Sequence, residues 1–267
     1  MPLARFGIFD GRKVPVAEIP AVRDVQLSSF ARRALSQLGF LSVAEKLAAE
    51  RPITLSEIAR LVDQAGVPVL MKLVKIATKN KTNPPSFDSS LAVQDFYKLG
   101  PKLNEFISHQ WCEDLRQRGV HRVELPLSLS AVEMLLDNGF ELDLVSNFDS
   151  RSSHESLVRE FEQLDYLVNR FSGIKSWMPL LSVESPQYRD QGARDFQLLR
   201  FVGIGKVICR ERVNIRIASP ILSREARPLV RLVGASEFVD HSPIDPADGE
   251  IFVRTFGFKL SGNNSGI

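Results

Sequence analysis

Four side chains between positions 124 and 241 have the chemistry of acids, bases or ion ligands. Glu124 lies in an apolar run, where a carboxylate can act as a general base or bind a ligand. Asp240 and His241 are adjacent, and they combine an acid with an imidazole that titrates near neutral pH. Arg216 interrupts the apolar run Val213–Ala218, and a guanidinium there can hold a carboxylate or phosphate through two parallel hydrogen bonds.

Each of these side chains also has a purely structural interpretation. Strand alternation can turn Arg216 outward against a helix carboxylate, and Glu124 can form an outward salt bridge with Arg122. Asp240 and His241 can be a turn aspartate followed by a solvated histidine. The residue types alone leave both interpretations open.

Further polar side chains follow the apolar runs and are candidate ligand-binding groups together with Arg216. They are Ser146, Asn147, Asp149, Ser182 and Ser219. Hydroxyls, amides and backbone N–H groups before a helix can bind a ligand, although the same residues also serve as helix caps. The His, Asp and Glu residues show no metal-binding spacing such as HxH or HExxH, so the sequence assigns no metal site. The pair Gly203-x-Gly205 lies inside a predicted helix and follows no strand, so no dinucleotide cofactor is expected.

Short apolar, β-branched runs alternate with helical segments from Gly119 onward, which is typical of parallel strands joined by crossover helices. Strands are predicted at Val120–Leu125, Glu141–Ser146, Ile174–Leu181, Asn214–Ala218 and Ser236–Asp240. Helices are predicted at Ser130–Asn138, Ser153–Phe171, Ala193–Cys209 and Ser223–Leu232. This order predicts an α/β fold, a partial or reshaped parallel (β/α) barrel, with any site at the C-terminal ends of the strands.

The sequence predicts helices in the part of the chain before the barrel. Leu27–Glu50 has helical periodicity with a break at Gly39, Thr54 and Glu57 form a capping box, and Pro68 suits the first turn of the next helix. We expect four divisions of the chain. Residues 1–80 form an N-terminal arm, with a short strand at Arg5–Phe9, followed by a helical region. They are followed by a linker with connecting helices (81–118), the barrel-type domain (119–245) and a C-terminal strand or tail (246–267).

Composition narrows the class of protein. The 267 residues are 44% hydrophobic, and 34 basic against 32 acidic side chains are interspersed without a basic stripe, so nucleic-acid binding is not favoured. The N-terminus lacks the apolar run of a signal peptide, and no segment reaches the roughly 18 apolar residues of a membrane span. Two cysteines far apart in the sequence fit a reducing compartment, so we expect a cytoplasmic protein without membrane contacts.

The helix pair within residues 54–79 allows a second interpretation. Its sequence resembles the helix-turn-helix of winged regulators and of methyltransferase dimerisation domains, and Lys72 and Lys75 could contact phosphates. No wing hairpin is evident after it, and a role in dimerisation or packing is the alternative.

Residues 196–219, continuing to Gly234-Ala235, resemble the last βα units of biotin-synthase-like radical S-adenosylmethionine (SAM) enzymes of the deazaflavin and futalosine synthase type. Gly139-Phe140 and Trp177–Leu180 resemble the preceding units. The resemblance implies a (β/α) barrel with a cysteine-bound iron–sulfur cluster, but the CxxxCxxC motif is absent. Without three thiolates SAM cannot be cleaved reductively, so radical chemistry is not predicted.

Three hypotheses follow for function. The first is a cluster-less radical-SAM-like barrel that binds a small anionic metabolite or acts as a non-catalytic partner of a biosynthetic enzyme. The second is a metal-free acid–base enzyme acting on small polar metabolites through Glu124, Asp240 or His241. The third is a helix-turn-helix regulator with a barrel-derived sensor. An incomplete barrel leaves open strand edges, so a homo- or hetero-oligomer is expected in each case. The sequence does not decide whether the protein is an enzyme.

Overall fold

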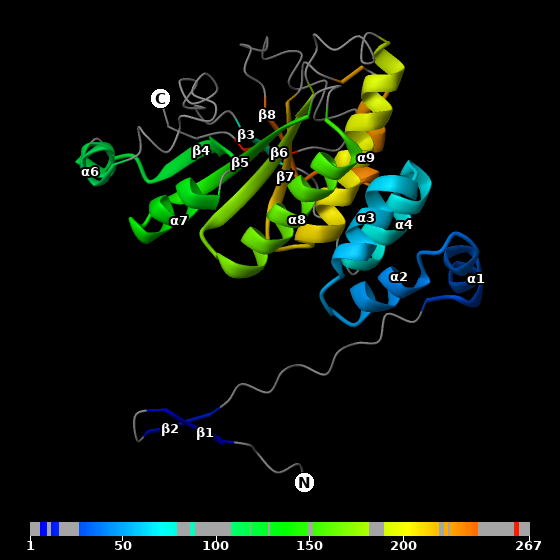
Figure 1. Cartoon of the computed structure of the whole chain (residues 1–267), viewed down its shortest axis with the longest axis horizontal. Coiled ribbons are helices and arrows are strands. Elements are labelled where there is room, and N and C mark those ends of the chain that lie inside the picture. Colours follow the sequence, from blue (N-terminus) through cyan, green and yellow to red (C-terminus); the bar gives the residue numbers. More distant parts are fainter. Residues whose placement is uncertain are drawn as a thin grey trace.

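The fold is taken from a computed structural model of the chain. It describes residues 6–9, 12–15, 27–78, 86–88, 108–117, 119–127, 129–148, 152–181, 190–218, 222–223, 225–239 and 259–261. Within these residues an N-terminal group of helices packs on a parallel α/β unit, as Figure 1 shows.

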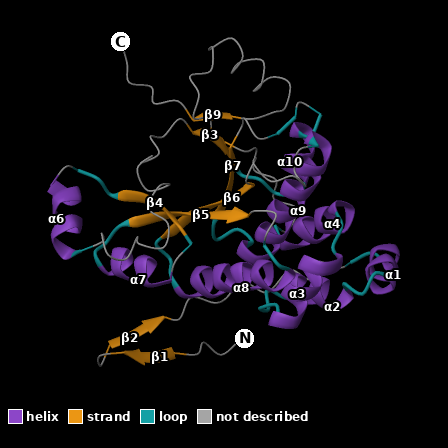
Figure 2. Cartoon of the chain, turned by 45° about the horizontal axis from the view of Figure 1, so that its top comes forward, coloured by secondary structure: helices purple, strands orange, loops and turns teal. Residues whose placement is uncertain are grey.

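A seven-stranded parallel sheet organises the described residues (Figure 2). Its strands are β3 (Ser86–Asp88), β4 (Arg122–Pro126), β5 (Glu141–Phe148), β6 (Ile174–Leu181), β7 (Asn214–Ala218), β8 (Glu237–Val239) and β9 (Lys259–Ser261). Their spatial order is β4-β5-β6-β7-β8-β3-β9, and every pair is parallel. The predicted α/β fold with a partial parallel barrel is therefore confirmed.

Helices connect consecutive strands and cover one face of the sheet. They are α6 (His109–Gln117), α7 (Leu129–Asp137), α8 (His154–Arg170), α9 (Gln191–Cys209) and α10 (Arg227–Leu232). The starts of the two long helices are capped by side chains: Ser153 accepts the N–H of Ser156, and Asp190 accepts the N–H of Ala193. These caps fix where α8 and α9 begin.

Four further helices form a second layer outside the barrel helices (Figure 1). They are α1 (Ser29–Gln37), α2 (Leu41–Ala48), α3 (Leu55–Gln64) and α4 (Val67–Ala77). The break at Gly39, where φ is +76°, and the capping box of Thr54 and Glu57 are both as predicted. The helix α4 packs on α9 and α3 packs on α8, so the N-terminal helices share one hydrophobic core with the barrel.

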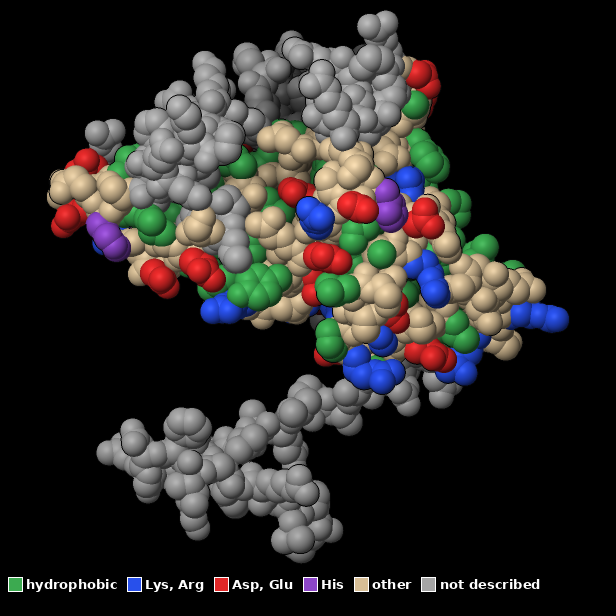
Figure 3. All heavy atoms as spheres, viewed as in Figure 1, with side chains coloured by type: hydrophobic (Ala, Val, Ile, Leu, Met, Phe, Trp, Pro, Cys, Tyr) green, Lys and Arg blue, Asp and Glu red, His purple; other side chains and the backbone are tan. Residues whose placement is uncertain are grey.

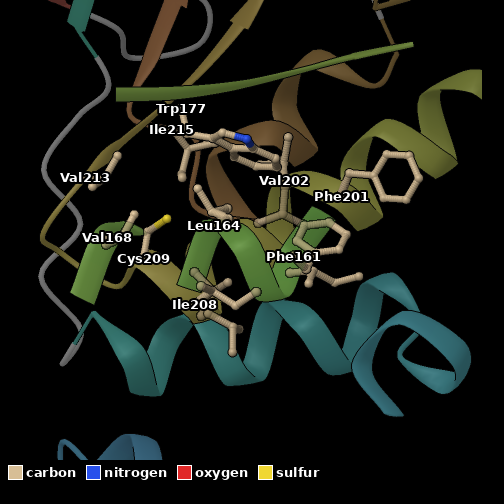
Figure 4. Packing of buried hydrophobic residues seen from close by; sticks show 14 of the residues in the cluster. Phe161, Leu164, Val168, Trp177, Phe201, Val202, Ile208, Cys209, Val213 and Ile215 are labelled. Atoms are coloured by element: carbon tan, nitrogen blue, oxygen red, sulfur yellow. The ribbon is translucent and has the colours of Figure 1, made fainter. Parts of the chain in front are cut away.

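The core between sheet and helices is built around Trp177. This side chain is fully buried, and its ring lies near those of Phe161 and Phe148 at centroid distances of 5.9 and 6.5 Å. Figure 4 shows the Trp177 ring on the helix side of the sheet, among side chains from α8 and α9. Such aromatic packing holds α8 and α9 at fixed positions against the strands.

The two glycines of α9 are explained by close packing on both sides of that helix. A Cβ at Gly205 would collide with the Trp177 ring, and a Cβ at Gly203 would lie 2.9 Å from Cβ of Leu70 on α4. The helix can therefore approach both the sheet and α4 because these two positions have no side chain. This packing accounts for the Gly203-x-Gly205 pair without any nucleotide.

The structure corrects several predicted elements. The strand β3 lies within the segment assigned to a linker, where its three residues are too few to give a periodic pattern. The N-terminal arm contains two antiparallel strands, β1 (Phe6–Phe9) and β2 (Arg12–Pro15), instead of one. The helix α10 begins at Arg227 and not at Ser223, because the Ser223 hydroxyl accepts the N–H of Ala226 in a turn before the helix. None of the described helices has the length and apolar character needed to cross a bilayer.

Candidate functional site

Arg216 lies on the concave side of the curved sheet and is almost fully buried, with 2% of its side chain exposed. Its Nη1 atom lies 3.1 Å from Oε2 of Glu124, on β4. Strands β7 and β4 are separated by β5 and β6, which in a flat sheet would place them about 14 Å apart. The contact is possible because the sheet curls toward its concave side, as it does in a barrel.

Two more carboxylates surround the same guanidinium. Nη1 of Arg216 lies 3.4 Å from Oδ2 of Asp143 on β5, and its Nε lies 3.3 Å from Oε2 of Glu237 on β8. All three carboxylates are buried. One cation thus joins strands β4, β5, β7 and β8 across the interior of the partial barrel.

Asp143 is held by further donors. Arg122 binds its two oxygens through Nε and Nη2 at 2.6 and 2.7 Å, and the Ser176 hydroxyl on β6 donates to Oδ1. This bidentate geometry is the strongest common form of a charged hydrogen bond. We call the group of Arg122, Glu124, Asp143, Ser176, Arg216 and Glu237 the lumen ion network.

The lumen ion network excludes the outward placement of Glu124 and Arg216. Both side chains point inward, and Arg122 pairs with Asp143 instead of Glu124. Because Arg216 already faces three carboxylates, its surroundings favour the role of an internal counter-ion over contact with an anionic ligand. Glu124, bonded to that guanidinium, is likewise placed as part of the network.

Asp143, Ser176 and Glu237 were not identified from the sequence. The signal that could have found them is a polar residue at every second position of an otherwise apolar strand, such as Asp143 between Leu142 and Leu144. Sequence patterns indicate polar residues at the ends of strands more clearly than residues such as Asp143 and Ser176, which lie within strands.

Beyond the lumen ion network, toward the C-terminal ends of the strands, the side chains on the concave face of the sheet are first apolar and then polar. Val145 and Met178 form a small buried cluster of their own, with Leu180 packed against it. Asn147 follows on the same face of β5, at the C-terminal end, and is exposed. Among the predicted ligand-binding residues that the structure describes, Asn147 is the one at the C-terminal end of a strand on the concave face.

Ser146 lies on the opposite side of the sheet. Its side chain is 1% exposed, and its hydroxyl accepts a hydrogen bond of 2.8 Å from Nε1 of Trp177. It also bonds to Glu160 on α8; burial raises the pKa of Glu160, and this hydrogen bond partly opposes the shift. Ser146 therefore satisfies buried polar groups between the sheet and the helices, on the face of β5 opposite to Asn147.

The remaining predicted site residues lie outside the described part of the chain. They are Asp149, Ser182, Ser219, Asp240 and His241. Their roles stay predictions.

DNA binding is one of the two roles that the sequence suggests for the helix pair α3 and α4. Most of α4 is buried, including Leu70, Leu73 and Val74, and this helix packs between α2 and α9. Lys72 and Lys75 remain exposed, and Lys72 lies over the ring of Phe30. This placement favours the packing role over insertion into a DNA groove. On the face drawn in Figure 3, basic and acidic side chains are interspersed.

The two cysteines do not fit an iron–sulfur cluster. Cys112 is on α6 and Cys209 ends α9, so neither follows a strand, and both are buried. Burial raises the pKa of the Cys209 thiol to about 12 and also raises that of Cys112. Cluster ligands are thiolates, and three are needed. Within the described residues, no group of three or more His, Cys, Asp or Glu side chains could hold a metal ion.

Both thiols should be unreactive in the folded chain. The nucleophile is the thiolate, and the raised pKa keeps each thiol protonated at neutral pH, while burial blocks access to the reagent. Ellman's reagent at neutral pH should release little product from the native protein and two equivalents per chain in guanidinium chloride. Rapid release from the native protein, equal to that from the unfolded chain, would show an exposed thiolate and contradict this placement.

Comparison with solved structures identifies chains of the same fold. The FeFe-hydrogenase maturase HydG from Carboxydothermus hydrogenoformans has a TM-score of 0.59 and 12% identity, over 86% of this chain and 80% of that one. Another HydG structure has a TM-score of 0.53 and 10% identity, over 82% and 73% of the two chains. Methylornithine synthase, PylB, has a TM-score of 0.56 and 9% identity, over 82% of this chain and 97% of that one. No protein family and no curated protein matches by sequence. At these identities the likeness shows that this chain shares the fold of those enzymes.

Proposed function

We propose that this chain is a barrel protein of the biotin-synthase-like radical SAM type that performs no radical chemistry and binds a small polar metabolite at the C-terminal ends of its strands. The fold likeness supports the barrel relationship. The burial of both cysteines supports the loss of the cluster. Free thiols also fit a reducing compartment such as the cytoplasm.

The lumen ion network is the observation that carries this proposal. It closes the interior below the Val145 and Met178 cluster with side chains that bind each other. A ligand would then bind above that cluster, near Asn147 and the loops after the strands, where barrels of this kind form their sites. The anionic character expected from Arg216 is not retained, because that cation already faces three carboxylates.

The lumen ion network also argues against the acid–base hypothesis. Glu124 would need a free carboxylate near a substrate, yet its Oε2 is 3.1 Å from a buried guanidinium. A general base bound to a permanent cation is less basic than an isolated one.

A second candidate, the non-catalytic partner, is favoured by the sheet edge at β4. Among the described strands β4 pairs with β5 alone, so β4 stands at one end of the strand order. Terminal strands of a sheet are common sites of association between chains.

Native mass spectrometry of the full chain purified from expressing cells tests the proposal. We expect a mass increment from a retained small molecule, lost in Asn147→Ala and kept in Asn214→Ala, an exposed asparagine at the N-terminal end of β7. A second polypeptide without a small molecule would support the partner instead. A bare monomer in all three samples would contradict both candidates.

A further inference from the structure

Phe30 on α1 has the largest exposed fraction of the large apolar side chains that the structure describes, at 76%. The helix α1 lies at the outer end of the N-terminal helices, beyond α3 and α4 as seen from the sheet (Figures 1 and 2). Nζ of Lys72, on α4, lies 5.9 Å from the centroid of the Phe30 ring, so the two helices meet at this residue. Aromatic side chains are enriched where proteins bind partners, which makes this ring a candidate contact.

Basic side chains surround the ring on both helices. Arg33 follows Phe30 by three residues on α1, and Lys75 follows Lys72 by three residues on α4. Side chains three positions apart lie on the same face of a helix, so each of these pairs shares one face. All four residues are exposed. We call Phe30, Arg33, Lys72 and Lys75 the α1–α4 patch.

The three cations of the α1–α4 patch are not balanced by the acidic side chains around them. None of the three has a carboxylate oxygen within 4 Å in the described part of the chain. The four acidic side chains of residues 27–78 each form an ion pair or an electrostatic interaction with another basic residue: Glu45 with Arg32, Glu50 with Arg210, Glu57 with Lys46, and Asp63 with Arg200. The patch therefore presents an exposed ring with three positive charges.

We infer that the α1–α4 patch binds an acidic polypeptide segment of another protein, in which an apolar side chain is flanked by aspartates or glutamates. The apolar side chain would contact the Phe30 ring, and the carboxylates would pair with Arg33, Lys72 and Lys75. Complementary charge of this kind steers the encounter between two proteins and fixes their register. The inference goes beyond the proposed metabolite site near Asn147 and does not depend on it.

A DNA duplex fits the same patch less well. Recognition of the major groove needs a helix that projects from the protein, whereas α4 packs between α2 and α9 with Leu70 and Leu73 buried. Three cations neutralise few phosphates, and affinity for a duplex grows with the number of phosphates that are contacted. Phe30 would also have no apolar partner along a phosphate backbone. An acidic segment with an apolar side chain uses both parts of the patch.

Fluorescence anisotropy with the full chain tests this inference. The probe is a fluorescein-labelled peptide in which Leu-Phe is flanked on each side by three glutamates. One control peptide has Ser-Ser in place of Leu-Phe, and the other has glutamine in place of every glutamate. At physiological ionic strength the probe should bind about tenfold more tightly than either control, and more weakly as salt is added. No saturable binding of the probe, or equal binding of the glutamine peptide, would overturn the inference.

Variants of exposed residues locate the binding surface. The pair Lys72→Glu and Lys75→Glu should weaken the probe by about tenfold or more, and Phe30→Ser by about fivefold, with Tm and circular dichroism little changed. The matched control Arg159→Glu reverses an exposed arginine of α8 and should bind normally.

Three outcomes would count against this surface. Undiminished affinity in the lysine variant would place binding elsewhere. An equal loss in Arg159→Glu would mean that only the total charge of the protein matters. A labelled DNA duplex that binds more tightly than the probe at the same salt, and is lost in the lysine variant, would assign the α1–α4 patch to nucleic acid.

Discussion

Replacing Arg216 with methionine should lower the free energy of unfolding by about 3 to 5 kcal/mol. The change leaves Glu124, Asp143 and Glu237 buried in the barrel interior after removal of the cation that joins them. Arg122 still binds Asp143, so the cost should fall mainly on the other two carboxylates. Urea unfolding followed by circular dichroism measures the difference.

Two further variants make this result specific to the lumen ion network. Arg32 forms an ion pair with Glu45, and 58% of the Arg32 side chain is exposed. Arg32→Met should therefore change the free energy of unfolding by less than about 1 kcal/mol. Adding Glu124→Gln and Glu237→Gln to Arg216→Met should recover part of the loss, because two unpaired charges are removed. A loss for Arg216→Met no larger than that for Arg32→Met would mean that the guanidinium is not buried among carboxylates.

Replacing Trp177 with alanine should also cost about 3 to 5 kcal/mol. The ring is fully buried, lies against the rings of Phe148 and Phe161 and donates a hydrogen bond to Ser146 from Nε1. The change leaves a cavity between the sheet and α9 and removes the donor that Ser146 accepts. Chemical unfolding of the variant gives the value, and a loss below about 1 kcal/mol would contradict the close packing of sheet and helices.

The approach of α9 to Trp177 can be tested from the helix side. Gly205→Ala places a Cβ against the indole ring and should destabilise by about 1 to 3 kcal/mol, although alanine favours a helix. Gly192→Ala is the matched control, since its nearest neighbour is the Asp190 carboxylate at 3.5 Å. The smaller ring of Trp177→Phe should rescue part of the Gly205→Ala loss. If Gly192→Ala is as harmful as Gly205→Ala, the ring does not explain the glycine.

The strands whose apolar runs have clear limits were predicted best. Both Ile174–Leu181 and Asn214–Ala218 have the predicted bounds, because each begins after a turn and is apolar at most of its positions. By contrast, β3 and β9 have three residues each, which is too short for a periodic signal. Their pairing depends on contacts with residues far along the chain, and a single sequence does not report those contacts.

The candidate site was only partly predictable for a related reason. The sequence identifies Arg216 and Glu124 as charges inside apolar runs, but it does not give the curvature that brings β7 against β4. The sequence also did not show which residues of β5 face each side of the sheet. Ser146 faces the helices, whereas Asn147 faces the concave side. A shift of one residue in that phase exchanges the two faces of a strand.

The central claim is that this radical-SAM-like barrel works without an iron–sulfur cluster. The most direct test is to measure the iron content of the protein after anaerobic reconstitution. The purified chain would be incubated with iron, sulfide and a reductant, desalted, and examined for bound iron, for visible absorption and by electron paramagnetic resonance with and without SAM. We expect no stoichiometric iron and no cluster signal, because its two cysteines are buried thiols on separate helices. A bound cluster whose signal changes on addition of SAM would contradict the account.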